Sequence, residues 1–141
     1  MMPKACFADT AFLIARLNPR DNHHQKARAL TAELKGSRLI TSEMIFTELL
    51  DAFAESGSHV REAACQLVKS LRGANSRTHI VEQTGELFQK ALQKHQNFSD
   101  KEWGLTDCAS FVIMEENAIT HALTTDHHFE QGGFIALMKE Q

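Results

Sequence analysis

Two aspartates each close a short apolar segment of the kind that forms a buried β-strand. Asp9 follows residues 5–8 (ACFA), and Asp126 follows residues 120–125 (THALTT). In a parallel α/β sheet, ligands bind outside the carboxyl ends of the strands, so an aspartate at such an end faces the place where a site forms. Both carboxylates are therefore expected at one edge of the sheet.

Two further carboxylates occur within predicted helices. Asp107 lies in the first turn of a helix that Thr106 is suited to cap, near the positive end of the helix dipole. Glu48 lies in the predicted helix 42–53, and the 3.6-residue period places it within an apolar face. A carboxylate in such a position is uncommon, which favours a role in a site. The apolar residues that share its face are Met44, Ile45, Leu49 and Ala52.

Four carboxylates at one sheet edge would repel each other, and protonation or cations must compensate that repulsion. Hard divalent ions, Mg²⁺ or Mn²⁺, are the natural occupants of a site made of oxygen ligands. Asp9, Asp107 and Asp126 are predicted as the principal ligands or as holders of metal-bound waters, and Glu48 as a ligand or as the residue that orients a water. The sequence does not assign the individual ligand shells.

Other polar residues stand beside these carboxylates. Thr10, Thr106 and Thr125 each adjoin one of them and could bind metal waters or a phosphate, although helix capping and strand-end hydrogen bonds are equally ordinary uses of threonine. Asp100 is a candidate additional acid in the loop before Asp107. Its simpler interpretation is a solvated turn residue.

The local contexts of the four carboxylates resemble those of the PIN-domain ribonucleases, and in particular the toxins of the VapBC type. The similar segments are residues 7–13 (FADTAFL), 47–50 (TELL), 105–108 (LTDC) and 123–134 (LTTDHHFEQGGF). The resemblance implies a three-layer α/β/α sandwich with a mainly parallel central sheet. It also implies a metal-dependent endoribonuclease, a small antitoxin that covers the active-site groove, and a homodimer.

Alternative interpretations remain beside this one. A PIN fold can serve as a non-catalytic module that binds RNA or protein, and the four acids could be unrelated caps and surface charges. A haloacid-dehalogenase-like phosphatase would need a second Asp at position 11, where this chain has Ala11. A thiol nucleophile at Cys108 is a further alternative, but no base is evident beside it.

The whole chain limits the class of protein. Its 141 residues suit one domain, 1–141, and it contains no apolar run of about 20 residues, so we expect a cytoplasmic protein without a membrane span. The three cysteines are expected to be reduced. The net charge of −3 falls largely on the four proposed site carboxylates, and the remainder of the chain is compatible with an RNA partner.

Strand and helix patterns alternate along the chain, which predicts an α/β fold with a mainly parallel sheet. One predicted helix has a basic face that could contact RNA, although a solvated surface is its simpler interpretation. Trp103, in a polar loop, could stack on a base, although packing against the following helix is equally simple. The basic residues are Arg61, Lys69, Arg72 and Arg77. Strands are predicted at residues 5–8, 38–41, 79–82, 120–125 and 134–137, and helices beginning near residues 11, 22, 42, 59, 84 and 106.

Overall fold

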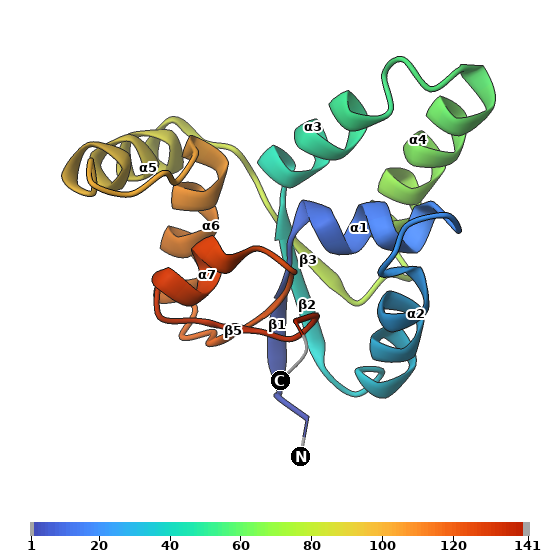
Figure 1. Cartoon of the computed structure of the whole chain (residues 1–141), viewed down its shortest axis with the longest axis horizontal. Helices are drawn as coiled ribbons and strands as arrows, with labels where there is room; N and C mark the ends of the chain where they lie inside the picture. Colours follow the sequence, from blue (N-terminus) through green and yellow to red (C-terminus); the bar gives the residue numbers. More distant parts are fainter. Residues whose placement is uncertain (1, 140–141) are drawn as a thin grey trace.

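The computed structural model describes residues 2–139 and shows strands and helices in alternation (Figure 1). The five strands are β1 (Ala5–Ala8), β2 (Arg38–Ser42), β3 (Thr78–Val81), β4 (His121–Leu123) and β5 (Ile135–Ala136). The helices between and around them are α1 (Thr10–Leu17), α2 (His24–Glu33), α3 (Glu43–Ala52), α4 (Ser58–Arg72), α5 (Gly85–Asn97), α6 (Leu105–Glu116) and α7 (His127–Gln131).

The strands form one sheet in the order β3-β2-β1-β4-β5, and every neighbouring pair runs parallel. At the centre, Phe7 pairs with Ala122 and Ala8 with Leu123, so β1 and β4 end at the same level. The predicted parallel α/β architecture is therefore confirmed.

Helices cover both faces of this sheet. Helices α1 to α4 lie on one side, and α5 to α7 lie on the other (Figure 1). From β1 the chain proceeds outward to β2 and β3, then crosses to β4 and continues outward to β5. The chain order therefore reverses between β1 and β4, which is the position where open parallel sheets form their ligand sites.

The core is built from apolar side chains that the sheet presents to both helical layers. The central strand β1 is apolar throughout because helices cover both of its faces. Phe7 stacks against Phe129 of α7, and Phe111 of α6 packs edge-on against the same ring. On the opposite layer, Leu13 and Ile45 are fully buried. The aromatic contacts fix β1 and α6 relative to α7.

Several predicted boundaries differ from the structure. Strand β4 ends at Leu123 instead of residue 125, and β5 contains only two residues. Helix α7 was not predicted, because five residues are too few to establish a helical period. Gly133, at φ +93°, forms the turn that returns the chain from α7 to β5.

The longest helix, α4, has fifteen residues and a largely polar surface. Within residues 2–139, no helix combines the length and the apolar character needed to cross a bilayer. Cys6 and Cys108 are buried and Cys65 is partly buried, and all three are free thiols, as predicted.

Candidate active site

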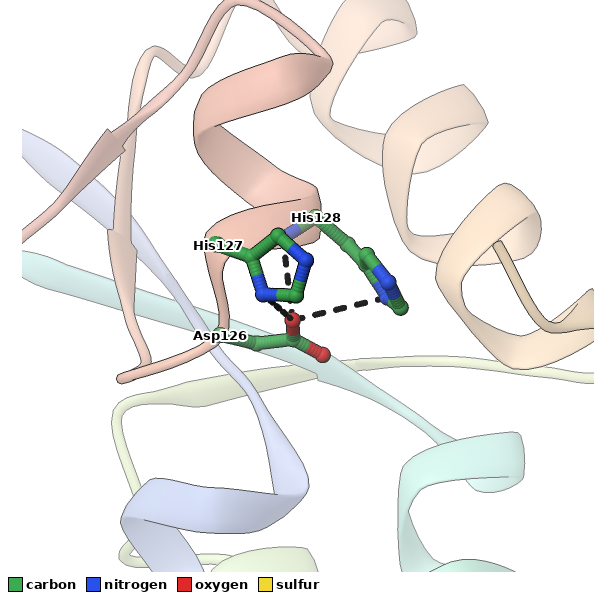
Figure 2. A group of neighbouring side chains, drawn as sticks. All are labelled: Asp126, His127 and His128. Carbon is green, nitrogen blue, oxygen red and sulfur yellow. Dashed lines mark hydrogen bonds and ion pairs between the residues drawn. The ribbon is translucent and has the colours of Figure 1, made fainter. Parts of the chain in front are cut away.

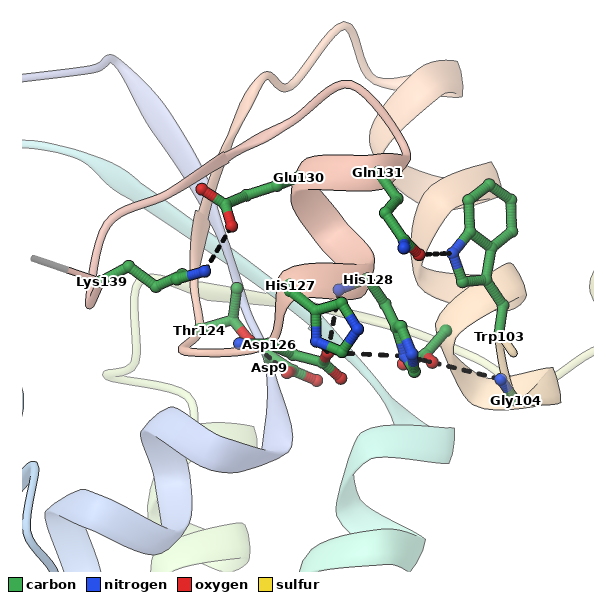
Figure 3. A network of polar contacts seen from close by, with 11 residues as sticks. Asp9, Trp103, Gly104, Thr124, Asp126, His127, His128, Glu130, Gln131 and Lys139 are labelled. Carbon is green, nitrogen blue, oxygen red and sulfur yellow. Dashed lines mark hydrogen bonds and ion pairs between the residues drawn. The ribbon is translucent and has the colours of Figure 1, made fainter. Parts of the chain in front are cut away.

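Asp9 occupies the centre of the candidate site, at the carboxyl end of β1. Its backbone N–H donates to the Leu123 carbonyl at 3.1 Å, which continues the pairing of β1 with β4 beyond the last strand residue. The residue is 7% exposed, and its carboxylate accepts a 2.6 Å hydrogen bond from the hydroxyl of Thr124 (Figure 3). Asp9 begins α1 without using its carboxylate as a cap, so the remaining oxygen is available to the site.

The pKa of Asp9 is raised to about 7. Burial is the largest cause, and the negative charges of Asp107 and Glu48 raise the pKa further. The hydrogen bonds from Thr124 and from the Thr10 backbone oppose the shift but do not cancel it. Carboxylates from β1, α3 and α6 therefore influence one another electrostatically.

Thr124 joins the ends of β1 and β4. Its hydroxyl donates to Asp9 and accepts a 3.0 Å hydrogen bond from the Asp126 backbone N–H, so one buried side chain positions both strand-end aspartates. The sequence analysis selected the neighbouring Thr125 instead. Both threonines follow the last residue of β4, so the strand pattern does not tell which of the two hydroxyls turns toward Asp9.

Asp126 stands at the N-cap of α7. Its Oδ1 accepts a 2.9 Å hydrogen bond from the His128 backbone N–H, which satisfies one of the free N–H groups at the helix start. The Nδ1 atoms of His127 and His128 lie 3.6 Å and 3.4 Å from the same oxygen (Figure 2). The sequence analysis gave neither histidine a role, although both follow the aspartate directly.

Asp107 approaches from α6. It is the third residue of the helix, and its Oδ2 accepts a 3.2 Å hydrogen bond from the backbone N–H of Gly104, the residue that caps α6. The predicted cap, Thr106, lies inside the helix, so that prediction is wrong. His128 Nδ1 lies 3.0 Å from the same oxygen of Asp107.

The pKa of Asp107 is also raised, chiefly by burial. The hydrogen bonds with Gly104 and His128 lower the pKa, and the charge of Asp126 raises it. Asp107 therefore links electrostatically to Asp126 on one side and to Asp9 on the other.

Glu48 reaches the site from α3. Its Oε1 accepts a 2.6 Å hydrogen bond from the Thr10 hydroxyl, so Thr10 connects the start of α1 to this glutamate. Glu48 is exposed and lies at the margin of the apolar face, whereas Ile45 and Leu49 at its centre are fully buried. The prediction that Glu48 lies within the apolar face is wrong. Its negative charge nevertheless acts on Asp9, as expected for a member of the predicted group of four carboxylates.

The remaining predicted neighbours do not join this network. Asp100 lies in an exposed turn and pairs with the adjacent Lys101 at 3.6 Å. Thr106 and Thr125 make no side-chain hydrogen bond within the described part of the chain; Thr125 lines a separate cavity of about 340 Å³. Their assignment to the site therefore stays a prediction without a contact to support it.

Trp103 and Cys108 have structural positions. Trp103 is buried between Phe98 and Phe111, and its indole N–H donates a 3.0 Å hydrogen bond to Gln131 of α7 (Figure 3). This packing leaves no free ring face for a base. Cys108 is fully buried, and burial raises the pKa of its thiol, which disfavours the reactive thiolate.

Within residues 2–139, no lysine or arginine forms an ion pair with any of the four carboxylates; the basic side chains beside them are the imidazoles of His127 and His128. Buried and mutually repelling oxygens without a paired cationic side chain form a donor set suited to divalent metal ions. Among the described residues, the group of metal-binding side chains whose ligand atoms all lie within 4.8 Å of one another is Asp126, His127 and His128. The assignment of Asp9, Asp107, Asp126 and Glu48 as metal ligands stays a prediction.

Comparisons with known proteins identify the family and the fold. The model of the PIN domain matches residues 6–135. A 23S rRNA-specific endonuclease of Mycobacterium tuberculosis, VapC20, is 28% identical over 137 residues, covering 95% of this chain and 98% of that protein.

Two solved structures share the fold. The crystal structure of VapC20, described as a sarcin-ricin loop cleaving toxin, superposes with a TM-score of 0.81 at 23% identity, covering 92% of this chain and 96% of that one. FitAcB from Neisseria gonorrhoeae superposes with a TM-score of 0.64 at 14% identity, covering 93% and 94%. Both likenesses concern the fold.

Proposed function

Because this chain belongs to the PIN domain family, we propose that it is a metal-dependent endoribonuclease that hydrolyses phosphodiester bonds in RNA. The observation that carries the proposal is the convergence of acidic side chains from four separate elements at the reversal point of the sheet. Asp9, Asp107 and Asp126 come from β1, α6 and the end of β4, and Glu48 comes from α3.

The donor set fits Mg²⁺ or Mn²⁺, with Asp9, Asp107 and Asp126 as the residues that would hold the ion. The raised pKa of Asp9 supports this choice, because a carboxylate that is costly to ionise alone gains most from a cation beside it. A bound divalent ion would supply an activated water and stabilise the leaving oxygen of the phosphodiester.

The protein groups around the carboxylates hold them in place. Thr124 fixes Asp9, Thr10 fixes Glu48, and His128 lies beside Asp107. Glu48 is the exposed member, so it is placed to orient a water or to meet the RNA backbone. Cys108 is buried with a raised pKa, which leaves water as the nucleophile.

Ribosomal RNA is the first substrate to test, because VapC20 is named as a 23S rRNA-specific endonuclease. We extend the proposal to a role as the toxin of a toxin–antitoxin pair, since VapC20 is described as a toxin. A small antitoxin that covers the exposed Glu48 margin would inhibit such an enzyme. A homodimer is proposed from the family resemblance, and light scattering of the purified protein measures it.

The decisive experiment incubates purified protein with 23S rRNA, both naked and within intact ribosomes, in Mg²⁺ or Mn²⁺. We expect discrete cleavage that stops with EDTA and is lost in Asp9→Asn. Asp100→Asn is the matched control, because Asp100 lies in an exposed turn outside the hydrogen-bonded network. It should cleave like the wild type.

Undiminished cleavage in EDTA would refute the metal mechanism. RNA binding without cleavage in either ion, by protein whose circular dichroism shows normal folding, would support the alternative of a non-catalytic binding module.

A further inference from the structure

Two histidines flank the carboxylate of Asp126 and form a cluster with it. The Nδ1 atoms of His127 and His128 lie 3.6 Å and 3.4 Å from Asp126 Oδ1, and one ligand atom from each of the three residues lies within 4.8 Å of the others (Figure 2). The His127 side chain is 63% exposed and that of His128 is 18% exposed. Solvent therefore reaches the cluster at His127, whereas the His128 side chain is largely buried.

The local structure explains why consecutive residues can converge here. Asp126 is the cap of α7, and its Oδ1 is fixed by the His128 backbone N–H at 2.9 Å. The carboxylate is thus held over the helix start, where the histidines of the first turn fold back toward it (Figure 2). Asp107 Oδ2 lies 3.0 Å from His128 Nδ1, which connects the cluster to the four carboxylates.

A cation suits the space between these atoms. In the hydrogen bond with Asp107, His128 Nδ1 carries the proton. When an ion replaces that proton and the ring is protonated at Nε2 instead, Nδ1 presents a lone pair, as the carboxylate oxygens do. Ligands of one transition-metal ion lie about 2.0–2.2 Å from the metal, which places neighbouring ligand atoms roughly 3–4 Å apart. The observed separations of 3.4 Å and 3.6 Å fall in that range.

We propose that His127 and His128 give the acidic site nitrogen ligands beside Asp126, so that it binds first-row transition ions from Mn²⁺ to Zn²⁺ in preference to Mg²⁺. The inference rests on the proposed function, because it concerns the metal preference of the same site. Mg²⁺ strongly prefers oxygen ligands, whereas imidazole favours the later ions of the series. Affinity should therefore rise from Mg²⁺ through Mn²⁺ to Co²⁺ and Zn²⁺.

The chain contains a matched control at the start of another helix. His23 and His24 are also adjacent, but His24 Nδ1 bonds the Ala15 carbonyl at 2.7 Å, and Asp21 accepts a hydrogen bond from the His23 backbone. Within residues 2–139, neither ring of that pair forms an ion pair with a carboxylate. Both pairs are His-His dipeptides, but His127 and His128 form a cluster with a carboxylate, whereas His23 and His24 do not.

The experiment titrates Co²⁺, Mn²⁺ and Mg²⁺ into tag-free, metal-free protein. Visible absorption of Co²⁺ and nitrogen couplings in pulsed EPR of Mn²⁺ report imidazole ligation, and thermal melts report affinity without any RNA. The doubly substituted variants are His127→Gln with His128→Gln, and His23→Gln with His24→Gln as the control.

We expect nitrogen couplings in the wild type and in the control, and at least about tenfold weaker Co²⁺ binding in the His127/His128 variant with little change for Mg²⁺. Equal affinity for Co²⁺ and Mg²⁺, unchanged by that variant and without nitrogen couplings, would overturn the inference while leaving metal-dependent cleavage intact. Nitrogen-coupled binding together with no RNA cleavage in any ion would support the inference and refute the proposed function.

Discussion

The hydroxyl of Thr124 and the carboxylate of Asp9 are joined by a buried 2.6 Å hydrogen bond across 115 positions of sequence. Thr124 also accepts from the Asp126 backbone, so the bond ties the ends of β1 and β4 to the start of α7. A carboxylate held by a neighbouring hydroxyl is oriented before any cation arrives. This relationship yields the first test of the site.

Thr124→Val should retain the fold and lose most RNA cleavage. Valine has nearly the same shape but cannot donate to Asp9, and a hydrogen bond to a charged group contributes about 1.5–3 kcal/mol. Cleavage assays and thermal melts measure the two effects. Thr125→Val is the control, since the Thr125 side chain makes no hydrogen bond with the described residues. Equal activity in both variants would show that Asp9 is positioned without Thr124.

Metal-free protein should become less stable as the pH rises from 5 to 8. The folded-state pKa of Asp9 is about 7 against an ordinary value of 3.8, so the folded state holds the proton more tightly than the unfolded state. The resulting stabilisation is fully present below pH 3.8 and is lost as the pH rises through 7. Thermal melts in EDTA across this pH range measure the trend.

Asp9→Asn removes the buried charge while Thr124 can still donate to the amide oxygen. The metal-free variant should therefore melt higher than the wild type at pH 8, by several degrees for about 1–2 kcal/mol, and at pH 5 the difference should shrink. A variant that melts lower at pH 8 would show that Asp9 is stabilised as an anion in the folded protein.

Binding of Mn²⁺ at pH 7 should release protons, because a cation beside Asp9 favours its ionised form. Calorimetric titrations in two buffers with different ionisation enthalpies measure the number released. Asp9→Asn should release fewer protons than the wild type. Identical heats in both buffers would place the ion away from Asp9.

Glu48→Gln should reduce cleavage strongly and change the free energy of unfolding by less than about 1 kcal/mol. Glu48 is exposed, and its hydrogen bond with Thr10 can be kept by the amide oxygen, so little stability depends on its charge. Asp51→Asn, on the exposed surface of the same helix, is the control. If both variants cleave normally, Glu48 serves only to bind Thr10.

Cys108→Ala should keep most of the activity, and iodoacetamide should leave the native enzyme active. The thiol is fully buried and burial raises its pKa, so it is neither accessible nor ionised. Cys65 is partly exposed and provides the positive control for labelling by mass spectrometry. Inactivation that parallels labelling of Cys108 would revive a thiol mechanism.

The sequence predicts the two site residues that directly follow strands. Asp9 and Asp126 follow short apolar segments, and the rule that parallel strands end at one edge brings them together without knowledge of the pairing. The alternation of strands and helices similarly predicts the parallel sheet. These features depend on local patterns alone.

The parts that sequence missed depend on contacts between distant segments. The choice between Thr124 and Thr125 depends on which hydroxyl turns toward Asp9 after β4 ends, and the position of His128 depends on the five-residue helix α7. The displacement of Glu48 from the apolar face reflects how α3 is rotated against its neighbours, which a period of 3.6 residues does not specify.

The site also has an order of assembly imposed by synthesis. Asp9 belongs to the first strand, but its hydrogen-bond partner and the β4 backbone that fixes it lie more than a hundred residues later. A growing chain on the ribosome therefore holds Asp9 and Glu48 long before Thr124 and Asp126 exist. The four carboxylates can assemble only when β4 inserts beside β1, so the complete group cannot form before the segment around Thr124 and Asp126 has emerged from the ribosome.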